Sequence, residues 1–260
     1  MGLCNTSGPM DDQRAVAESI SAEAAERFAA DGFTVLEAAI DDDELAWLRG
    51  VYERLFRQRW ESGDPDFHDF VAGAEDDDGE GSGFYQVLYP ERDVPELFET
   101  RYFLRVRDAV STLLRTPADE LTVFGHLMVK APGRGPETPW HQDEAFMDPE
   151  WESDGLGVWL PLEGASVESG CLHFVPGSHR GPVLEHRRIG ADGTSRALAT
   201  TAEITGSVAC PLRAGDASIH SMRTLHYAGP NLTDEPRRAF VLVWRTPPRR
   251  AESPQPRPWL

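Results

Sequence analysis

The sequence predicts a mainly β domain, a barrel or a sandwich, with helices flanking it on the N-terminal side. Residues 20–119 contain segments of helical periodicity, whereas short apolar segments separated by glycine and proline turns follow up to residue 245. The apolar content of 40%, with 12 Phe and 7 Trp, can fill a substantial core. A length of 260 residues suits one large domain with an added helical layer.

The N-terminal part is expected to form two helices and one short strand. Residues 1–19 are polar and predict a frayed end. Ser21 can cap a helix that runs through about Ala30 and ends at Gly32, and Phe33–Leu36 has the composition of a strand. A second helix fits Asp42 to about Trp60, because its apolar side chains recur at helical spacing and form one face.

The chain changes character after this helix. The acidic run Glu75–Gly81 has no apolar side chain to bury, so we expect a loop there. A further helix fits Arg101–Arg115. The whole region 20–119 is therefore expected to support the core and to supply part of a substrate rim.

Short strands dominate the remainder of the chain. Residues 120–246 are assigned to a strand-rich core, and the proline-rich segment 247–260 to an irregular tail. The predicted strands are Leu121–Lys130, Gly157–Leu162, Cys171–Val175, Ser207–Leu212, Asp216–His220 and Phe240–Arg245.

Charge and cysteine content argue against several classes of function. Asp and Glu number 44 against 25 Lys and Arg, which gives a formal charge of −19. Such a surface repels nucleic acid and anionic lipid, so we expect neither a nucleic-acid nor a membrane partner. The 3 cysteines are too far apart for a disulfide framework, and no apolar run approaches the roughly 20 residues that cross a bilayer. We expect a cytoplasmic protein that acts on a small molecule.

The strongest chemical signal is the segment His141-Gln142-Asp143. In an extended segment residues i and i+2 point to the same face, so an imidazole and a carboxylate can reach one metal ion. His226 offers a third ligand from a distant strand. Two imidazoles and one carboxylate on one face of an octahedron leave three positions open, which is the facial triad of non-haem iron(II) oxygenases. A structural zinc site would need a fourth ligand, and none stands in a suitable pattern.

The open positions of such an ion can hold a chelating 2-oxo acid and O₂. The far carboxylate of the acid then needs a buried cation, and a guanidinium matches a carboxylate bidentately. Arg237 and Arg238 stand beyond His226, at the start of an apolar segment. Their side chains face opposite ways on a strand, so only one of them can serve, and strand parity alone does not choose between them.

Five further motifs stand in a fixed order over residues 120–245. They are Met128–Pro132, Pro139–Asp143, Val158–Leu162, Glu168–His179, and Gly215–His226 followed by Asn231, Pro236 and Arg237. With these motifs the chain resembles the phytanoyl-CoA dioxygenase family of iron(II)- and 2-oxoglutarate-dependent oxygenases, which includes ectoine hydroxylase.

The resemblance implies a double-stranded β-helix, which is a jelly-roll or cupin-like core. It makes His141, Asp143 and His226 the ligands of an Fe(II) cofactor, with 2-oxoglutarate and O₂ as cosubstrates. By its offset from His226, it selects Arg237 over Arg238 as the partner of the 2-oxoglutarate C5 carboxylate. The implied reaction hydroxylates an unactivated C–H bond and releases succinate and CO₂, although some relatives desaturate, cyclise or epimerise instead.

The resemblance also places Lys130 and Trp159 near the cosubstrate. One position departs from the family pattern, because many relatives carry a hydroxyl two residues after the distal histidine and this chain has Ala228 there. Thr224, Tyr227 or water is expected to replace the missing hydrogen bond.

Substrate contacts are expected from residues 83–92 and from the insert 181–206, both predicted at the pocket rim. Their composition predicts a medium-sized, partly polar metabolite or natural-product intermediate. His126 can face either the pocket or the core, and His220 is expected to support a ligand rather than to be one. The candidate substrate residues are Tyr85, Met128, Phe146 and Arg223.

Two other functions fit the same residues. A jelly-roll metalloenzyme that does not use 2-oxoglutarate, such as an isomerase or another oxygenase, would not need Arg237 for turnover. A non-catalytic binding protein with a vestigial site would not bind iron tightly. Metal binding and the effect of an Arg237 substitution therefore distinguish the three hypotheses.

Overall fold

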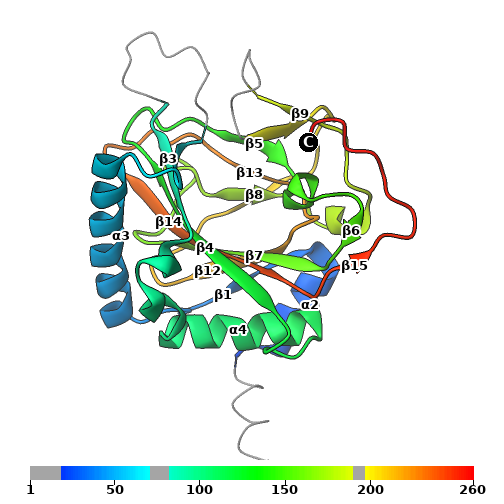
Figure 1. Ribbon diagram of the computed structural model, residues 1–260, viewed down its shortest axis with the longest axis horizontal. Helices are drawn as coiled ribbons and strands as arrows, with labels where there is room; N and C mark the ends of the chain where they lie inside the picture. The colour runs from blue at the N-terminus through cyan, green and yellow to red at the C-terminus, as the bar shows by residue number, and fades with distance from the viewer. Residues whose placement is uncertain (1–18, 71–81, 190–196) are drawn as a thin grey trace, which may run out of the picture.

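Two facing β-sheets form the centre of the protein in a computed structural model that describes residues 19–70, 82–189 and 197–260 (Figure 1). The larger sheet contains, in spatial order, β1 (Phe33–Leu36), β12 (Ala217–Ser221), β7 (Gly155–Pro161), β14 (Arg237–Arg245), β4 (Thr122–Lys130), β3 (Phe84–Leu88) and β2 (Phe67–Asp69). The smaller sheet contains β11 (Val208–Cys210), β8 (Leu172–Phe174), β13 (His226–Ala228) and β5 (Thr138–His141).

Shorter elements complete the described chain. Strand β9 (His186–Arg188) pairs with β10 (Leu198–Thr200), and β6 (Trp151–Glu152) pairs with β15 (Arg249–Arg250). The short 3₁₀ helices are η1 (Pro90–Arg92), η2 (Pro95–Phe98), η3 (Asp143–Phe146) and η4 (Ser178–Arg180).

The helices are α2 (Ala22–Asp31), α3 (Asp42–Ser62) and α4 (Arg101–Leu114), close to the predicted bounds. Each begins at a side-chain cap, because the oxygens of Ser21, Asp41 and Thr100 accept a backbone N–H from the first helical turn. Within the described ranges, no helix has the length and apolar character needed to cross a membrane.

The two faces of the larger sheet pack against different partners. On β14, Phe240, Leu242 and Trp244 join the core cluster that includes apolar residues of α3 and α4. Ala239 and Val241 point the other way and join a second cluster with residues of the smaller sheet. Because successive side chains of a strand alternate between its faces, one strand contributes to both cores. Figure 1 shows this arrangement, with α4 below the larger sheet and the smaller sheet above it. The mainly β, jelly-roll expectation with flanking helices is therefore confirmed.

Several strands were not predicted. All six predicted strands occur with shifted ends, but the segment predicted only as rim contains β3, which pairs with β4. Strands β5 and β13, which hold two of the candidate ligands, are short and were read only as motifs. The tail is largely irregular, apart from β15. The acidic run Glu75–Gly81 and most of the predicted frayed end lie outside the described residues.

Gly32 provides a direct test of how the end of α2 packs against His179 of η4 and Thr224. Its φ of 83° is left-handed, and a Cβ there would come within 2.6 Å of the Thr224 hydroxyl oxygen and closer still to the His179 ring. We expect Gly32→Ala to lower the free energy of unfolding by about 3 kcal/mol, because a left-handed alanine and an overpacked contact add together. Urea unfolding measures this change.

Gly63 is the matched control for this substitution. It also ends a helix with a left-handed φ, of 64°, but a Cβ there would meet nothing within 4 Å. Gly63→Ala is therefore expected to cost only about 1 kcal/mol, the conformational part alone. Equal losses in the two variants would contradict the packing argument.

Candidate active site

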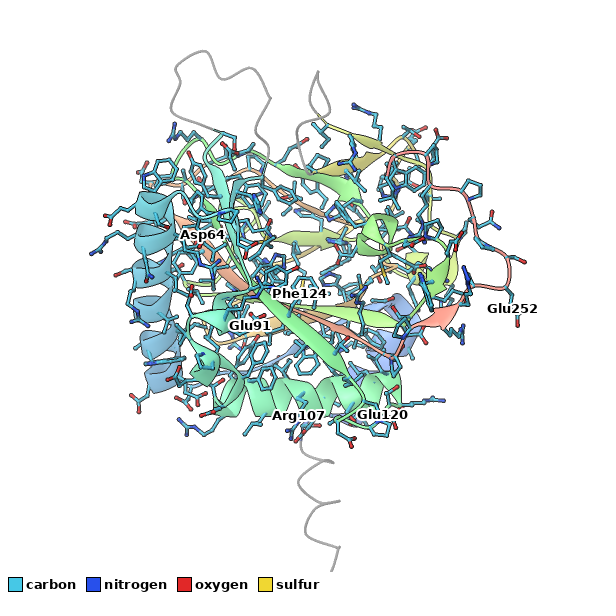
Figure 2. The ribbon with its side chains drawn as sticks, viewed as in Figure 1. Asp64, Glu91, Arg107, Glu120, Phe124 and Glu252 are labelled. Atoms are coloured by element: carbon cyan, nitrogen blue, oxygen red, sulfur yellow. The ribbon has the colours of Figure 1, made fainter. Side chains whose placement is uncertain are left out.

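A cavity of about 820 Å³ opens between the two sheets. Its wall includes residues of β3, β4, β7, β12 and β14 from the larger sheet and of β5, β8 and β13 from the smaller one. Figure 2 shows one of the lining residues, Phe124 of β4, near the centre of the molecule, whereas Glu252 lies at its outer edge. Among the described residues that line the cavity, 13 are apolar or aromatic and nine are polar or ionisable.

His141, Asp143 and His226 meet at this cavity. His141 ends β5, Asp143 begins η3, and His226 begins β13, where it lies directly opposite His141 in the antiparallel register. One donor atom of each residue lies within 4.8 Å of the others. The Asp143 Oδ1 atom is 3.5 Å from His141 Nε2 and 3.7 Å from His226 Nε2. Three donor atoms thus surround a space of the size that one metal ion needs.

Backbone carbonyls orient both imidazoles toward this space. The Nδ1 atom of His141 lies 2.7 Å from the Pro139 oxygen, and that of His226 lies 3.0 Å from the Thr224 oxygen. An Nδ1–H that donates to a carbonyl leaves the lone pair on Nε2, which is the atom that a metal would take. Burial, with His141 beside it, lowers the pKa of His226 to about 3, so this ring is neutral at neutral pH.

His220 supports Asp143 from β12. Its Nε2 atom lies 3.3 Å from the Asp143 Oδ2 atom, the oxygen that does not face the other two histidines. Burial alone would raise the pKa of Asp143, but His226, His141 and His220 together hold it well below its usual range. A Cβ on Gly157 would come within 2.6 Å of the His220 Nε2 atom, so glycine at this point of β7 leaves room for the ring.

Arg237 supplies a buried cation to the same cavity. It is only 3% exposed, and its Nε and Nη1 atoms are buried without a hydrogen-bond partner. Its guanidinium carbon lies 5.2 Å from the centre of the Trp159 ring, and burial lowers its pKa to about 10. Arg238 points to the helical side, where it pairs with Glu163 and Glu53.

Four other predicted residues line the cavity or lie beside it. Met128, Phe146 and Trp159 line the cavity together with the ligand cluster. Lys130 is fully buried beside it, and its Nζ atom donates to the Ala228 and Gly229 oxygens at 3.1 and 2.7 Å. Its ammonium therefore holds the backbone that follows His226.

Two predicted substrate contacts, Tyr85 and Arg223, do not line the cavity. Tyr85 stacks on Phe67 outside the cavity, because on β3 the alternate side chains Phe84 and Gln86 are the ones that face inward. Arg223 does not line the cavity and forms a bidentate ion pair with Glu144.

Neither side chain proposed to replace the missing hydroxyl faces the cavity. The Thr224 hydroxyl donates to the Gly32 oxygen at 2.8 Å, so it serves the helix contact instead. The Tyr227 hydroxyl donates to Glu137 at 2.7 Å, because its strand neighbours Ala228 and His226 take the inward positions on β13.

Several cavity residues were missed or left open, among them Gln86, His126, Arg188 and Met222. Gln86 hydrogen-bonds His126, and both line the cavity; burial lowers the pKa of His126 to about 4. The β3 alternation would have revealed Gln86 had this segment been recognised as a strand. Arg188 and Met222 reach the cavity from β9 and from the turn after β12, and no local pattern in the sequence indicates this.

Known proteins resemble this chain in both sequence and fold. Residues 28–239 match the family described as phytanoyl-CoA dioxygenase (PhyH). A structure of EvdO2 from Micromonospora carbonacea var. aurantiaca, complexed with 2-oxoglutarate, is 42% identical, covers 93% of this chain and 97% of that chain, and has a TM-score of 0.80. The epimerase SnoN, solved with Fe³⁺, alpha ketoglutarate and nogalamycin RO, is 26% identical over 86% of this chain and 82% of its own, with a TM-score of 0.67.

One curated relative matches a shorter part of the chain. The probable alpha-ketoglutarate-dependent hypophosphite dioxygenase of Stutzerimonas stutzeri is 33% identical over 123 residues, which are 43% of this chain and 40% of that protein. The chain thus spans less than half of the length of this relative.

Proposed function

The chain belongs to the phytanoyl-CoA dioxygenase family, and we propose that it is an iron(II)- and 2-oxoglutarate-dependent oxygenase that hydroxylates a C–H bond of a small metabolite or natural-product intermediate. The family match covers residues 28–239, and EvdO2, solved with 2-oxoglutarate, resembles the chain over almost its whole length. The proposal goes beyond the family match in specifying hydroxylation and the class of substrate.

His141, Asp143 and His226 would hold the iron. The donor set fits this ion, since two neutral imidazoles and one carboxylate leave open positions for exchangeable ligands. When bound, iron with 2-oxoglutarate supplies O₂ activation, in which the oxo acid loses CO₂ to become succinate and one oxygen atom goes to the substrate. The protein contributes the orientation of both rings and the ionised state of Asp143.

The observation that carries the proposal is the unpaired guanidinium of Arg237. A buried cation is costly without a counter-ion, and no carboxylate pairs with Arg237 in the described part of the chain. The C5 carboxylate of 2-oxoglutarate is an anion of the right shape for its planar fork. Arg237 and the three proposed metal ligands line one cavity, and a single cosubstrate that chelates the metal and binds Arg237 requires this arrangement.

The cavity wall supports a substrate with a large apolar part. Phe124, Phe146, Met222 and Val243 provide apolar surface, and Asp143 is the sole carboxylate among the described residues that line the cavity. An apolar enclosure excludes water from the reacting carbon. Because SnoN was solved with nogalamycin RO, a natural-product intermediate is the substrate class that we propose.

Anaerobic spectroscopy tests the proposal without knowledge of the substrate. Addition of Fe(II) and 2-oxoglutarate to the metal-free protein is expected to give the weak visible charge-transfer band of the chelate. Succinate release is then measured while candidate compounds are added, and the product of any stimulating compound distinguishes hydroxylation from epimerisation or cyclisation. A folded protein that shows neither the band nor succinate release would contradict the proposal.

A further inference from the structure

The segment after β15 lies against the turn that carries Asp143. We define residues 251–260 as the C-terminal strap, which contains three of the five prolines of the predicted irregular tail. Figure 1 shows the strap leaving β15 at the side of the molecule, with the C-terminus marked beside β9 and β5. These neighbours hold His141 at the end of β5 and Arg188 at the end of β9.

Two strap residues bind the backbone of η3 and the residue after it. Arg257 Nη1 donates to the Glu144 oxygen and, at 2.6 Å, to the Met147 oxygen, and its side chain is only 9% exposed. Trp259 Nε1 donates to the Ala145 oxygen at 2.8 Å. The strap therefore donates to three carbonyls, all within four residues of Asp143.

The turn has few hydrogen bonds of its own. Ala145 N donates to the Gln142 oxygen at 3.0 Å and Met147 N to the Glu144 oxygen at 3.1 Å. Glu144 N donates to the Met222 oxygen at 2.9 Å, which ties the turn to the end of β12. A short 3₁₀ turn with so few bonds is not rigid by itself, so carbonyl partners from outside contribute to its shape.

The strap is also connected, through His186 of β9, to Gln142, the residue before Asp143. The Trp259 ring lies 5.5 Å from the ring of His186, whose Nε2 atom accepts the Gln142 N–H at 3.1 Å. The Trp259 oxygen accepts from Arg188 Nε at 2.9 Å, and Arg188 lines the cavity. Trp259 is thus connected on one side to the residue before Asp143 and on the other to a cationic side chain of the cavity wall.

From these contacts we infer that Arg257 and Trp259 are positioning residues, which hold the Asp143 turn in its metal-binding geometry and fix Arg188 at the cavity wall. The inference rests on the proposed metal-binding function. Phe146, which lies in the same turn and lines the cavity, is held by the same bonds. The strap would therefore influence metal affinity and the shape of the substrate space together, without contacting any of the three proposed metal ligands through its Arg257 and Trp259 side chains.

Two substitutions test the inference with little change of volume. Trp259→Phe removes the indole N–H, and Arg257→Gln removes the donor that reaches two carbonyls. Titration with Co(II), followed by visible absorbance, is expected to show 10–100-fold weaker binding in each variant, the loss typical of an outer hydrogen-bond partner. Arg257→Lys is expected to recover part of the affinity, because an ammonium can still donate to a carbonyl.

Arg250→Gln is the matched control. Arg250 lies just before the strap and pairs with Glu150, but 68% and 58% of the two side chains are exposed, and neither residue lines the cavity. Its Co(II) affinity is expected to remain within twofold of the unchanged protein, since an exposed ion pair contributes little. Equal losses in Arg250→Gln and Arg257→Gln would show a general effect of charge and overturn the inference.

A second measurement keeps the inference separate from the proposed function. Hydrogen exchange of the backbone amides of residues 142–147, in metal-free protein, is expected to become faster in Trp259→Phe and Arg257→Gln and to stay unchanged in Arg250→Gln. Unchanged exchange in this turn overturns the positioning role whether or not the protein binds metal. If exchange rises but no variant, nor the unchanged protein, binds Co(II), the proposed function fails and the mechanical role of the strap stands.

Discussion

His226→Ala is expected to weaken Fe(II) binding at least about 100-fold and to abolish succinate release. Loss of an outer hydrogen-bond partner already costs 10–100-fold in metal affinity, and this substitution removes a proposed ligand itself. His226 is 5% exposed, and it is one of three described residues whose donor atoms lie within 4.8 Å of one another. Equilibrium dialysis with Fe(II) under anaerobic conditions measures the affinity.

The adjacent strand offers a matched control for this substitution. His173 on β8 lies opposite Tyr227 in the register, one position away from the pair His226 and Phe174. It therefore points to the other face of the smaller sheet, where its ring meets the edge of Tyr227. His173→Ala is expected to leave Fe(II) affinity within about twofold. If both variants lost iron equally, the assignment of His226 and His173 to opposite faces of the smaller sheet would be wrong, and with it the proposed set of ligands.

Arg237→Gln is expected to weaken 2-oxoglutarate binding by about 3 kcal/mol, which corresponds to a factor of about 100. Glutamine keeps much of the length but has neither the charge nor the planar fork that pairs with a carboxylate. The buried position of Arg237 increases the loss, because little water can replace the missing partner. Calorimetric titration of 2-oxoglutarate into Mn(II)-loaded protein measures the change, and the apparent KM for 2-oxoglutarate follows it.

Arg238→Gln is the control that the sequence itself supplies. Arg238 is the next residue on β14 but pairs with Glu163 and Glu53 on the helical side of the sheet. Its substitution is expected to leave 2-oxoglutarate binding unchanged. Turnover that survives Arg237→Gln and does not require added 2-oxoglutarate would favour the alternative of a metalloenzyme that does not use this cosubstrate.

The candidate site was predictable where strand geometry and residue type act over short distances. His141 and Asp143 are two residues apart, so any extended or nearly extended backbone brings both toward one point. The assignment of His226 depended on a motif that resembles the family pattern, and the structure brings its donor atom to the same cluster. The choice of Arg237 over Arg238 also came from the resemblance, and the alternation of β14 places Arg237 in the cavity.

The predictions that failed concern residues whose direction depends on distant contacts. Tyr85 is expected at the pocket rim from its place in residues 83–92, but the pairing of β3 with β4 turns it away from the cavity. Arg223 is a candidate substrate contact, but it forms an ion pair with Glu144 and does not line the cavity. Thr224 is a candidate replacement for the hydroxyl missing at Ala228, but its hydroxyl donates to the Gly32 oxygen of a segment far away in the chain.

The amino-acid order, together with the family resemblance that it carries, was enough to define the class of centre: an i, i+2 histidine and aspartate, a distant histidine and one of two adjacent arginines at the start of a strand. Only the folded arrangement decided which polar groups face the cavity, because side-chain direction follows strand pairing and ion pairs between residues far apart in the chain. The strap is the clearest case. Its sequence predicts an irregular tail, and its contacts with the Asp143 turn, 113 to 114 residues away, exist only after the two segments have been brought together.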